Sequence, residues 1–135
     1  MANDWNTKII DEFHANDGKV GGPFAGMTIL LLHHKGAKTG TERVNPLAYQ
    51  PVDDHFAVFG SKGGAPTNPD WYHNVQAHPD VTVEVGTETI PVHARVAEGD
   101  ERDRIWTRQK ELAPGFAEYE MKTSRQIPVI VLERR

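Results

Sequence analysis

Cysteine is absent from this chain of 135 residues, which excludes a disulfide framework, a thiolate zinc site and thiol catalysis. Long apolar runs are absent too. The longest, "MTILLL" at 27–32, is far shorter than the roughly 20 residues that a membrane-spanning helix needs. The opening stretch, "MANDWNTKII", lacks the apolar centre of a signal peptide. We therefore expect a soluble protein of the cytoplasm.

An excess of positive charge is also lacking, since 15 lysines and arginines stand against 19 aspartates and glutamates, a formal net charge of −4. A protein of that charge does not attract nucleic acid over its whole surface, so any anion site must be local. With 38% hydrophobic residues the chain can bury its own core. We expect one domain over residues 1–135.

The pattern of apolar residues predicts a helix, a glycine-rich loop that ends at residue 26, and then six strands. Trp5, Ile9 and Phe13 recur every four residues, so the helix packs its apolar stripe on the body or, alternatively, contacts a membrane or a partner through residues 5–13. Strands are expected at 28–33, 44–52, 55–60, 81–85, 90–96 and 127–132, with hairpin turns at 53–54 and 86–88. Few crossover helices separate them, which favours an antiparallel sheet curled into a small barrel.

Two further helices are indicated by their start signals. Asn68 followed by Pro69 resembles an N-cap with proline at the first helical position, which predicts a short helix over 69–78. Asp100 could cap a longer helix that ends at Leu112. The expected class is therefore mainly β with flanking helices.

The stretch "HHKGAKTGTERVNP" gathers cations around glycines directly after the apolar run; we call residues 35–43 the cationic turn. Lysine, arginine, a threonine hydroxyl and backbone N–H groups near glycine are the donors that a phosphate or carboxylate needs. The alternative is a solvated hairpin with ordinary surface lysines. The stretch matches neither a Walker A loop nor GxGxxG.

A second cluster, "FGSKGGAPTNPDWY", again places a lysine and a hydroxyl among glycines at the end of a strand. Ser61 and Lys62 could meet the same ligand from the other side, while Gly63 and Gly64 let the backbone approach it closely. Trp71 and Tyr72 follow in the predicted short helix. They could wall a flat ring system or pack in the core.

Three runs, "GAKTGTERVNPLAY", "GSKGGAPTNPDWYHNVQAHPDVTVEV" and "IPVIVLER", resemble the deazaflavin-dependent nitroreductase family of actinobacteria. Members use coenzyme F420 and fold as a split β-barrel related to flavin reductases and pyridoxamine-phosphate oxidases. The resemblance, which spans residue 28 to the C-terminus, implies hydride transfer from reduced deazaflavin to a quinone, a nitro compound or an activated unsaturated lactone. A non-catalytic carrier of F420 or flavin is the alternative activity, and flavin mononucleotide (FMN) the alternative cofactor.

The resemblance also implies which residues contact the cofactor. Its phosphate and tail would lie along the turn and the strand that follows, at Lys35, Ala37, Lys38, Thr39, Gly40, Arg43, Val44, Asn45, Pro46, Leu47 and Ala48. The deazaflavin ring would lie beside Phe59, Gly60, Ser61, Lys62, Gly63 and Gly64. The ligand would be closed over by Asp70, Trp71, Tyr72, His73 and Asn74. Ala37 stands where relatives often carry an arginine, so this chain would have one cation fewer to bind the phosphate and tail of the cofactor.

Two residues are the catalytic candidates. We expect Ser61, by its hydroxyl or its backbone N–H, to polarise the acceptor, and Tyr119 to orient it or to help deliver a proton. Solvent could supply the proton instead, and Tyr119 could be a half-buried packing residue. Nitroimidazole-reducing members present several tyrosines in the C-terminal helix, where this chain has Phe116, Tyr119 and Lys122, and only Tyr119 matches.

The seven histidines do not predict a metal site. His33 and His34 are adjacent in a predicted strand and therefore point to opposite faces, so they cannot easily share one ion. His73 and His78 are five residues apart in a predicted helix, which is also poor spacing, and no HExxH pattern is present. We expect a small hydride acceptor as the partner of a monomer or dimer.

Overall fold

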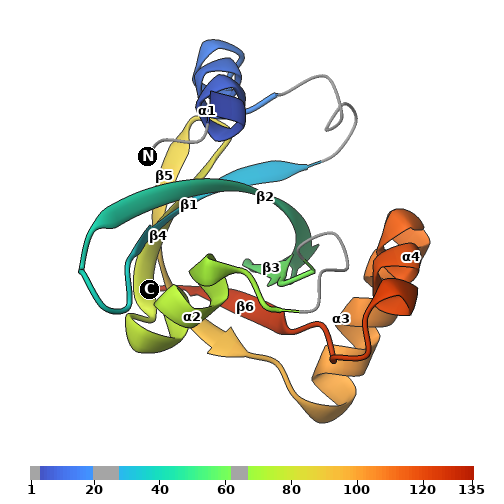
Figure 1. Ribbon diagram of the computed structural model, residues 1–135. Coiled ribbons are helices and arrows are strands. Elements are labelled where there is room, and N and C mark those ends of the chain that lie inside the picture. The colour runs from blue at the N-terminus through green and yellow to red at the C-terminus, as the bar shows by residue number, and fades with distance from the viewer. Residues whose placement is uncertain (1–3, 20–27, 62–66) are drawn as a thin grey trace.

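The computed structural model describes residues 4–19, 28–61 and 67–135. Along the chain it contains α1 (Asp4–Ala15), β1 (Ile29–Lys35), β2 (Glu42–Val52), β3 (His55–Phe59), α2 (Asp70–Ala77), β4 (Asp80–Val85), β5 (Glu88–Val96), α3 (Gly99–Leu112), α4 (Gly115–Lys122) and β6 (Val129–Arg134). The strands form a closed barrel in the order β1-β2-β3-β6-β5-β4, with every neighbouring pair antiparallel (Figure 1). The predicted antiparallel barrel is confirmed.

The barrel interior is filled by the inward-facing half of each strand. Leu30 and Leu32 of β1 are fully buried there, and β4 and β5 add alternating valine and isoleucine side chains. Trp71 and Val75 of α2 pack against the same cluster, so α2 covers part of the barrel from the front in Figure 1. The period-2 alternation that predicted the strands therefore marks the core.

The outer face of β1 is covered as well, by α1. Phe13 is 1% exposed and packs with Ile29 and Leu31, with Val44 at the edge of the cluster. Because both faces of β1 are buried, its sequence is a continuous apolar run and not an alternating one. The predicted packing of the helix stripe on the body is confirmed.

Membrane contact through residues 5–13 finds no support, because Ile9 and Phe13 are buried and not available to a bilayer. Among the described residues, no helix combines the length and the apolarity that crossing a bilayer requires. The side chain of Trp5, the third member of the predicted stripe, lies outside the described part.

A third cluster joins α3 and α4 to the barrel wall. The rings of Phe59 and Trp106 lie 5.8 Å apart, and Phe116 of α4 contacts both of them at 5.6 and 6.1 Å between ring centroids. Gln50, buried on the outer face of β2, donates from Nε2 to the Ile105 carbonyl at 3.0 Å. These contacts orient α4 beside the end of β3.

Both hairpin turns are confirmed, while several element ends differ from the sequence predictions. Asp53 and Gly86 adopt the left-handed conformation at φ 54° and 60°, as tight turns require. Pairing of Lys35 with Glu42 extends the ladder of β1 and β2 beyond the predicted ends. β6 starts later than predicted, at Val129, because Pro128 has no N–H to donate to a ladder.

The predicted helix starts at Asn68 and Asp100 are wrong by one or two residues. α2 begins at Asp70 with Pro69 as its N-cap, and the Asn68 side chain instead accepts a hydrogen bond from Arg125. α3 begins at Gly99, after Glu98. Asp100 lies in its first turn, where a carboxylate complements the helix dipole.

Candidate functional site

The cationic turn is held in shape by its own backbone. The Gly36 N–H donates to the Thr41 carbonyl, and the Gly40 N–H to the Gly36 carbonyl, both at 2.9 Å. Thr39 Oγ1 accepts from the Thr41 N–H at 3.2 Å. Gly40 has φ +70°, where a side chain would be strained. Hydrogen bonds between its own residues therefore set the shape of the turn.

The cations of this turn are not neutralised by nearby carboxylates. Lys35, Lys38 and Arg43 are all exposed, and within residues 4–19, 28–61 and 67–135 none of them forms an ion pair. Arg95, by contrast, is paired with Glu101 at 2.6 Å. In a chain of net charge −4, this local group of free cations is available to an anionic ligand.

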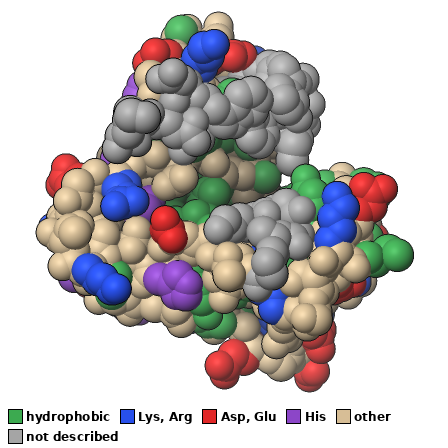
Figure 2. Space-filling view, viewed as in Figure 1, with side chains coloured by type: hydrophobic (Ala, Val, Ile, Leu, Met, Phe, Trp, Pro, Cys, Tyr) green, Lys and Arg blue, Asp and Glu red, His purple; other side chains and the backbone are tan. Residues whose placement is uncertain are grey.

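A hollow of about 410 Å³ lies between the turn and α2. It is lined by Gly36, Ala37, Lys38, Thr39, Arg43, Asp70, His73 and Asn74. The fold thus brings together two segments that lie about 30 residues apart in the chain, and most of these residues are binding candidates from the sequence. Figure 2 shows basic, acidic and histidine side chains mixed on this face. Among the lining residues that the structure describes, Asp70 is the one carboxylate.

A larger hollow of about 710 Å³ follows the seam between β1 and β4. The two strands pair only from Leu31 to His33, so they diverge beyond that point. Lys35 and Arg43 line the hollow, and Arg43 also lines the smaller one. The two hollows therefore adjoin at the base of the turn.

Polar side chains replace apolar ones at the end of the barrel interior nearest the turn. His34, which is 3% exposed, contacts Asn45 Oδ1 through Nε2 at 2.7 Å and Asn74 Nδ2 through Nδ1 at 3.1 Å. Asn74 Oδ1 in turn accepts the Ala37 N–H at 2.9 Å. His33 faces outward and contacts Glu84 at 2.6 Å, so the predicted opposite orientation of the two histidines is confirmed.

His34 is a site residue that the sequence analysis missed. Its signal was present: after Leu30 and Leu32, position 34 is the next inward-facing position of the strand, and a histidine there is a buried polar group. Burial lowers the pKa of His34 and the Arg43 charge adds to that, while the hydrogen bond to Asn45 acts in the opposite direction. The neutral imidazole is therefore the favoured form.

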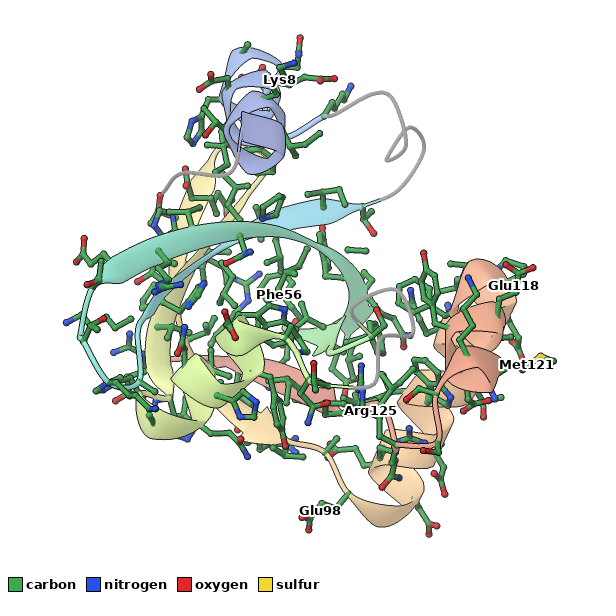
Figure 3. The ribbon with its side chains drawn as sticks, in the orientation of Figure 1. Lys8, Phe56, Glu98, Glu118, Met121 and Arg125 are labelled. Carbon is green, nitrogen blue, oxygen red and sulfur yellow. The ribbon has the colours of Figure 1, made fainter. Side chains whose placement is uncertain are left out.

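The strand end at Gly60 and Ser61 is held by Arg125, which the sequence also did not reveal. The Arg125 guanidinium donates to the Gly60 carbonyl at 3.0 Å, the Ser61 carbonyl at 2.9 Å and Asn68 Oδ1 at 2.7 Å. Burial lowers the pKa of Arg125. Figure 3 places this residue between α2, β6 and α4. Lys62, Gly63 and Gly64 lie outside the described residues.

Glycine is required at the strand end itself. A Cβ on Gly60 would lie 2.7 Å from the Pro128 side chain, and the Gly60 N–H donates to the Pro128 carbonyl at 3.0 Å. The Ser61 residue is 9% exposed. The segment before β6 therefore packs directly on the strand end at Gly60.

Other candidates from the sequence lie elsewhere. Trp71 is 5% exposed and fills the core, which was one of its two alternatives. Tyr119 is half-buried with its ring edge-on to Phe116 at 5.3 Å. Ala48 and Phe59 pack into apolar clusters on the outer side of the barrel and line neither hollow. Val44 packs at the edge of the α1 cluster and also lines the larger hollow.

Comparison with known proteins gives the family. The family of F420H(2)-dependent quinone reductases matches residues 5–134. The chain is 39% identical over 127 residues to an F420H(2)-dependent quinone reductase of Mycobacterium tuberculosis (strain ATCC 25618 / H37Rv), covering 91% of this chain and 85% of that protein.

Solved structures agree on the fold. An F420-H2 dependent reductase, FDR-A, superposes with a TM-score of 0.72 at 42% identity, covering 78% of this chain and 94% of that one. The chain of a domain-swapped dimer superposes with a TM-score of 0.74 at 39% identity, covering 96% of this chain and 98% of that one. A pyridoxamine 5'-phosphate oxidase-like protein of Listeria innocua, at 12% identity, TM-score 0.59 and coverage of 97% and 94%, shares the fold alone. With its split-barrel fold and its sequence identity to these reductases, the chain belongs to the F420H(2)-dependent quinone reductase family.

Proposed function

We propose that this protein uses reduced F420 to reduce a quinone, and that the cationic turn and the hollow beside α2 hold the phosphate of the cofactor. The observation that carries the proposal is the group of exposed cations, Lys35, Lys38 and Arg43, that has no ion-pair partner in the described part of the chain and borders two adjoining hollows. A phosphate-bearing cofactor fits these donors. When bound, reduced F420 supplies a hydride, which makes the reaction a two-electron reduction.

The turn would act as an anion clamp. Lys38 and Arg43 supply charge, the Thr39 hydroxyl supplies a further donor, and each charge-assisted hydrogen bond is worth about 1.5 to 3 kcal/mol. Three or four such bonds are enough for roughly micromolar affinity. We place the anionic tail of the cofactor along the base of the turn toward Lys35, where the two hollows adjoin.

The ring would lie beside the strand end at Gly60 and Ser61. Arg125 fixes the carbonyls of both residues, and we expect the Ser61 N–H and hydroxyl to be the groups that meet the ligand. Lys62, Gly63 and Gly64 would complete this side. Ser61 would polarise the carbonyl oxygen of the acceptor, and Tyr119 would orient the acceptor through its hydroxyl or donate a proton to it.

The range of acceptors extends this proposal. A quinone is the acceptor class of the family, and we infer that nitro compounds and activated unsaturated lactones react as well, because each accepts a hydride and a proton. A carrier of F420 or flavin would need the same clamp without turnover. Oxidation of the reduced cofactor that accelerates when a quinone is added distinguishes the enzyme from the carrier.

We also infer that residues 1–135 act as one domain, as a monomer or a dimer. The interior barrel cluster draws on five of the six strands and on α2, so we expect one cooperative unfolding transition. Light scattering of the purified protein gives the oligomeric state. Two separated calorimetric transitions would contradict the single domain.

The test of the clamp is a fluorescence titration with F420 and, in parallel, with FMN. We expect F420 to bind more tightly than FMN, and Lys38→Ala to weaken F420 binding about tenfold because one charge-assisted contact is lost. Lys8→Ala on α1 is the matched control, because Lys8 is an exposed lysine away from both hollows (Figure 3). Binding of neither chromophore, or equal weakening by both variants, would reject the proposal.

A further inference from the structure

A line of neutral hydrogen bonds connects the cationic turn to the interior of the barrel. It runs from the Ala37 N–H to Asn74, on to His34 and then to Asn45, and so joins the turn, α2, β1 and β2. His34 and Asn74 are 3% and 6% exposed. Buried polar groups cost free energy unless all of them are paired, so this line is a constrained unit.

The backbone sets the direction of every bond in this line. The Ala37 N–H can only donate, so the atom that faces it on Asn74 must be the amide oxygen. The amide nitrogen of Asn74 therefore points at His34 and donates to Nδ1, which must be unprotonated. His34 then carries its proton on Nε2 and donates it to Asn45 Oδ1.

This direction determines what Asn45 presents to a ligand. With its oxygen bound to His34, the group that remains is the amide NH₂, a donor. Within the described part of the chain no hydrogen bond uses that NH₂. Asn45 is half-buried, one position along β2 from the outward-facing Val44 and two from Arg43. A donor beside Arg43 suits a phosphate oxygen and does not suit a cation.

We propose that His34 is a positioning residue for the cofactor: as the neutral Nε2–H tautomer, it locks the cationic turn onto α2 and leaves the NH₂, a donor, as the group that Asn45 offers to the cofactor. This proposal rests on the proposed function of the turn. His34 itself acts only through Asn74 and Asn45. The role differs from packing, because an apolar side chain of the same size would fill the space but leave both asparagine side chains unpaired.

The charges around His34 favour the neutral imidazole, the form that this line of hydrogen bonds needs. Arg43 lies opposite His34 in the β1–β2 register, His33 precedes it in β1, and Asp70 reaches it from α2. Burial and the two basic neighbours disfavour a second proton on the ring, while the hydrogen bond to Asn45 and the Asp70 charge favour it. A second proton would place an N–H against the NH₂ of Asn74 and break the connection to Ala37.

The binding test compares two substitutions at this one position. Glutamine carries an amide nitrogen and oxygen spaced like the two ring nitrogens, so His34→Gln can donate to Asn45 and accept from Asn74 at once. Leucine can do neither. For F420 binding to the full chain we expect His34→Leu to raise Kd at least about tenfold and His34→Gln to stay within about threefold of wild type.

The matched control is His55→Leu, the same chemical change on a histidine of β3. His55 lines neither hollow, and its Nδ1 accepts the Arg134 N–H at 3.2 Å, away from this line of hydrogen bonds. We expect its Kd for F420 to stay within about twofold of wild type. Thermal melting of all four proteins identifies any variant that is not folded.

A second readout needs no cofactor. The ¹⁵N chemical shifts of the His34 imidazole distinguish the two neutral tautomers, and we expect the Nε2–H form. The Ala37 amide should be protected from hydrogen exchange in wild type and His34→Gln, and should lose that protection in His34→Leu, since its acceptor on Asn74 is no longer held.

The outcomes separate the two proposals. If wild type binds F420 and a folded His34→Leu binds it equally well, the positioning role is overturned and the clamp stands. An Nδ1–H tautomer overturns it too. If wild type does not bind F420, the proposed function fails and the role of His34 toward the cofactor fails with it.

Discussion

The cationic turn and the strand end at Gly60 and Ser61 are both positioned by a side chain from another part of the chain, but by bonds of different kinds. Neutral amide and imidazole groups hold the turn through Asn74. A guanidinium holds Gly60 and Ser61 through their carbonyls. Held by neutral groups, the turn keeps its own cations free for an anion, whereas at Gly60 and Ser61 the positive charge of Arg125 is used within the protein. The positive charge of a side chain alone would not distinguish a cation available to a ligand from one that holds the protein's own backbone.

The largest expected effect is that of removing the guanidinium of Arg125. Replacing it by methionine leaves the Gly60 and Ser61 carbonyls and Asn68 without their donor, so we expect a loss of about 3 kcal/mol in the free energy of unfolding. Urea denaturation measures that loss. Arg125→Lys keeps the charge but not the planar fork of donors, so it should recover only part of the stability. Full recovery by lysine would show that charge alone matters at this position.

The free cations of the turn predict a salt dependence that Arg125 does not share. Raising the ionic strength from about 0.05 to about 0.5 M should weaken F420 binding several-fold, because exposed charges are screened. In Lys38→Ala the slope of log Kd against log salt should be smaller than in wild type. The stability contributed by Arg125, measured with Arg125→Met at both salt concentrations, should change little. Equal salt sensitivity of both quantities would remove the distinction.

Acid should destabilise the fold in two steps, one at each side of β1. Because burial lowers the pKa of His34, the unfolded chain binds its proton first, so stability falls as the pH drops below about 6.5. The pKa of Glu84 is lowered by hydrogen bonds from His33 and His14, which outweigh the opposing effect of partial burial. Its contribution is therefore lost at more acidic pH, as the carboxyl becomes protonated.

Chemical denaturation between pH 4 and 8 measures both steps. His34→Gln should flatten the upper part of the curve and Glu84→Gln the lower part. We expect about 1 kcal/mol or less from Glu84, since its partners are largely exposed. Unchanged curves in both variants would assign the acid sensitivity to other groups.

The smallest effect is expected at Tyr119. Tyr119→Phe keeps the edge-on contact with Phe116 but removes the hydroxyl, so stability should be nearly unchanged. If Tyr119 orients the acceptor or donates a proton, kcat with a quinone should fall a few-fold, to about one tenth at most, because solvent can also supply the proton. Unchanged kcat and KM on every good acceptor would leave Tyr119 a packing residue.

Much of the fold was predictable because its signals are local. Alternation in "VTVEV", the Asp53–Asp54 turn and the continuous run of β1 gave the strands, the hairpins and the buried position of β1. Helix starts were less accurate. Asn68 looks like an N-cap, but the guanidinium of Arg125, 57 residues later in the chain, binds its side chain instead. A local propensity lost to a stronger charge-assisted bond.

For the candidate site too, the local features were predictable from the sequence and the contacts between distant segments were not. Residue types and spacing alone predicted an antiparallel sheet curled into a barrel, and a group of cations and glycines after a buried strand, because side-chain period and turn chemistry are properties of adjacent residues. The sequence by itself could not say that Asn74 would meet Ala37, that His34 would be neutral, or that Arg125 would hold Gly60. Only the tertiary structure decided these contacts, because hydrogen-bond direction and burial depend on which distant segments the closed barrel brings together.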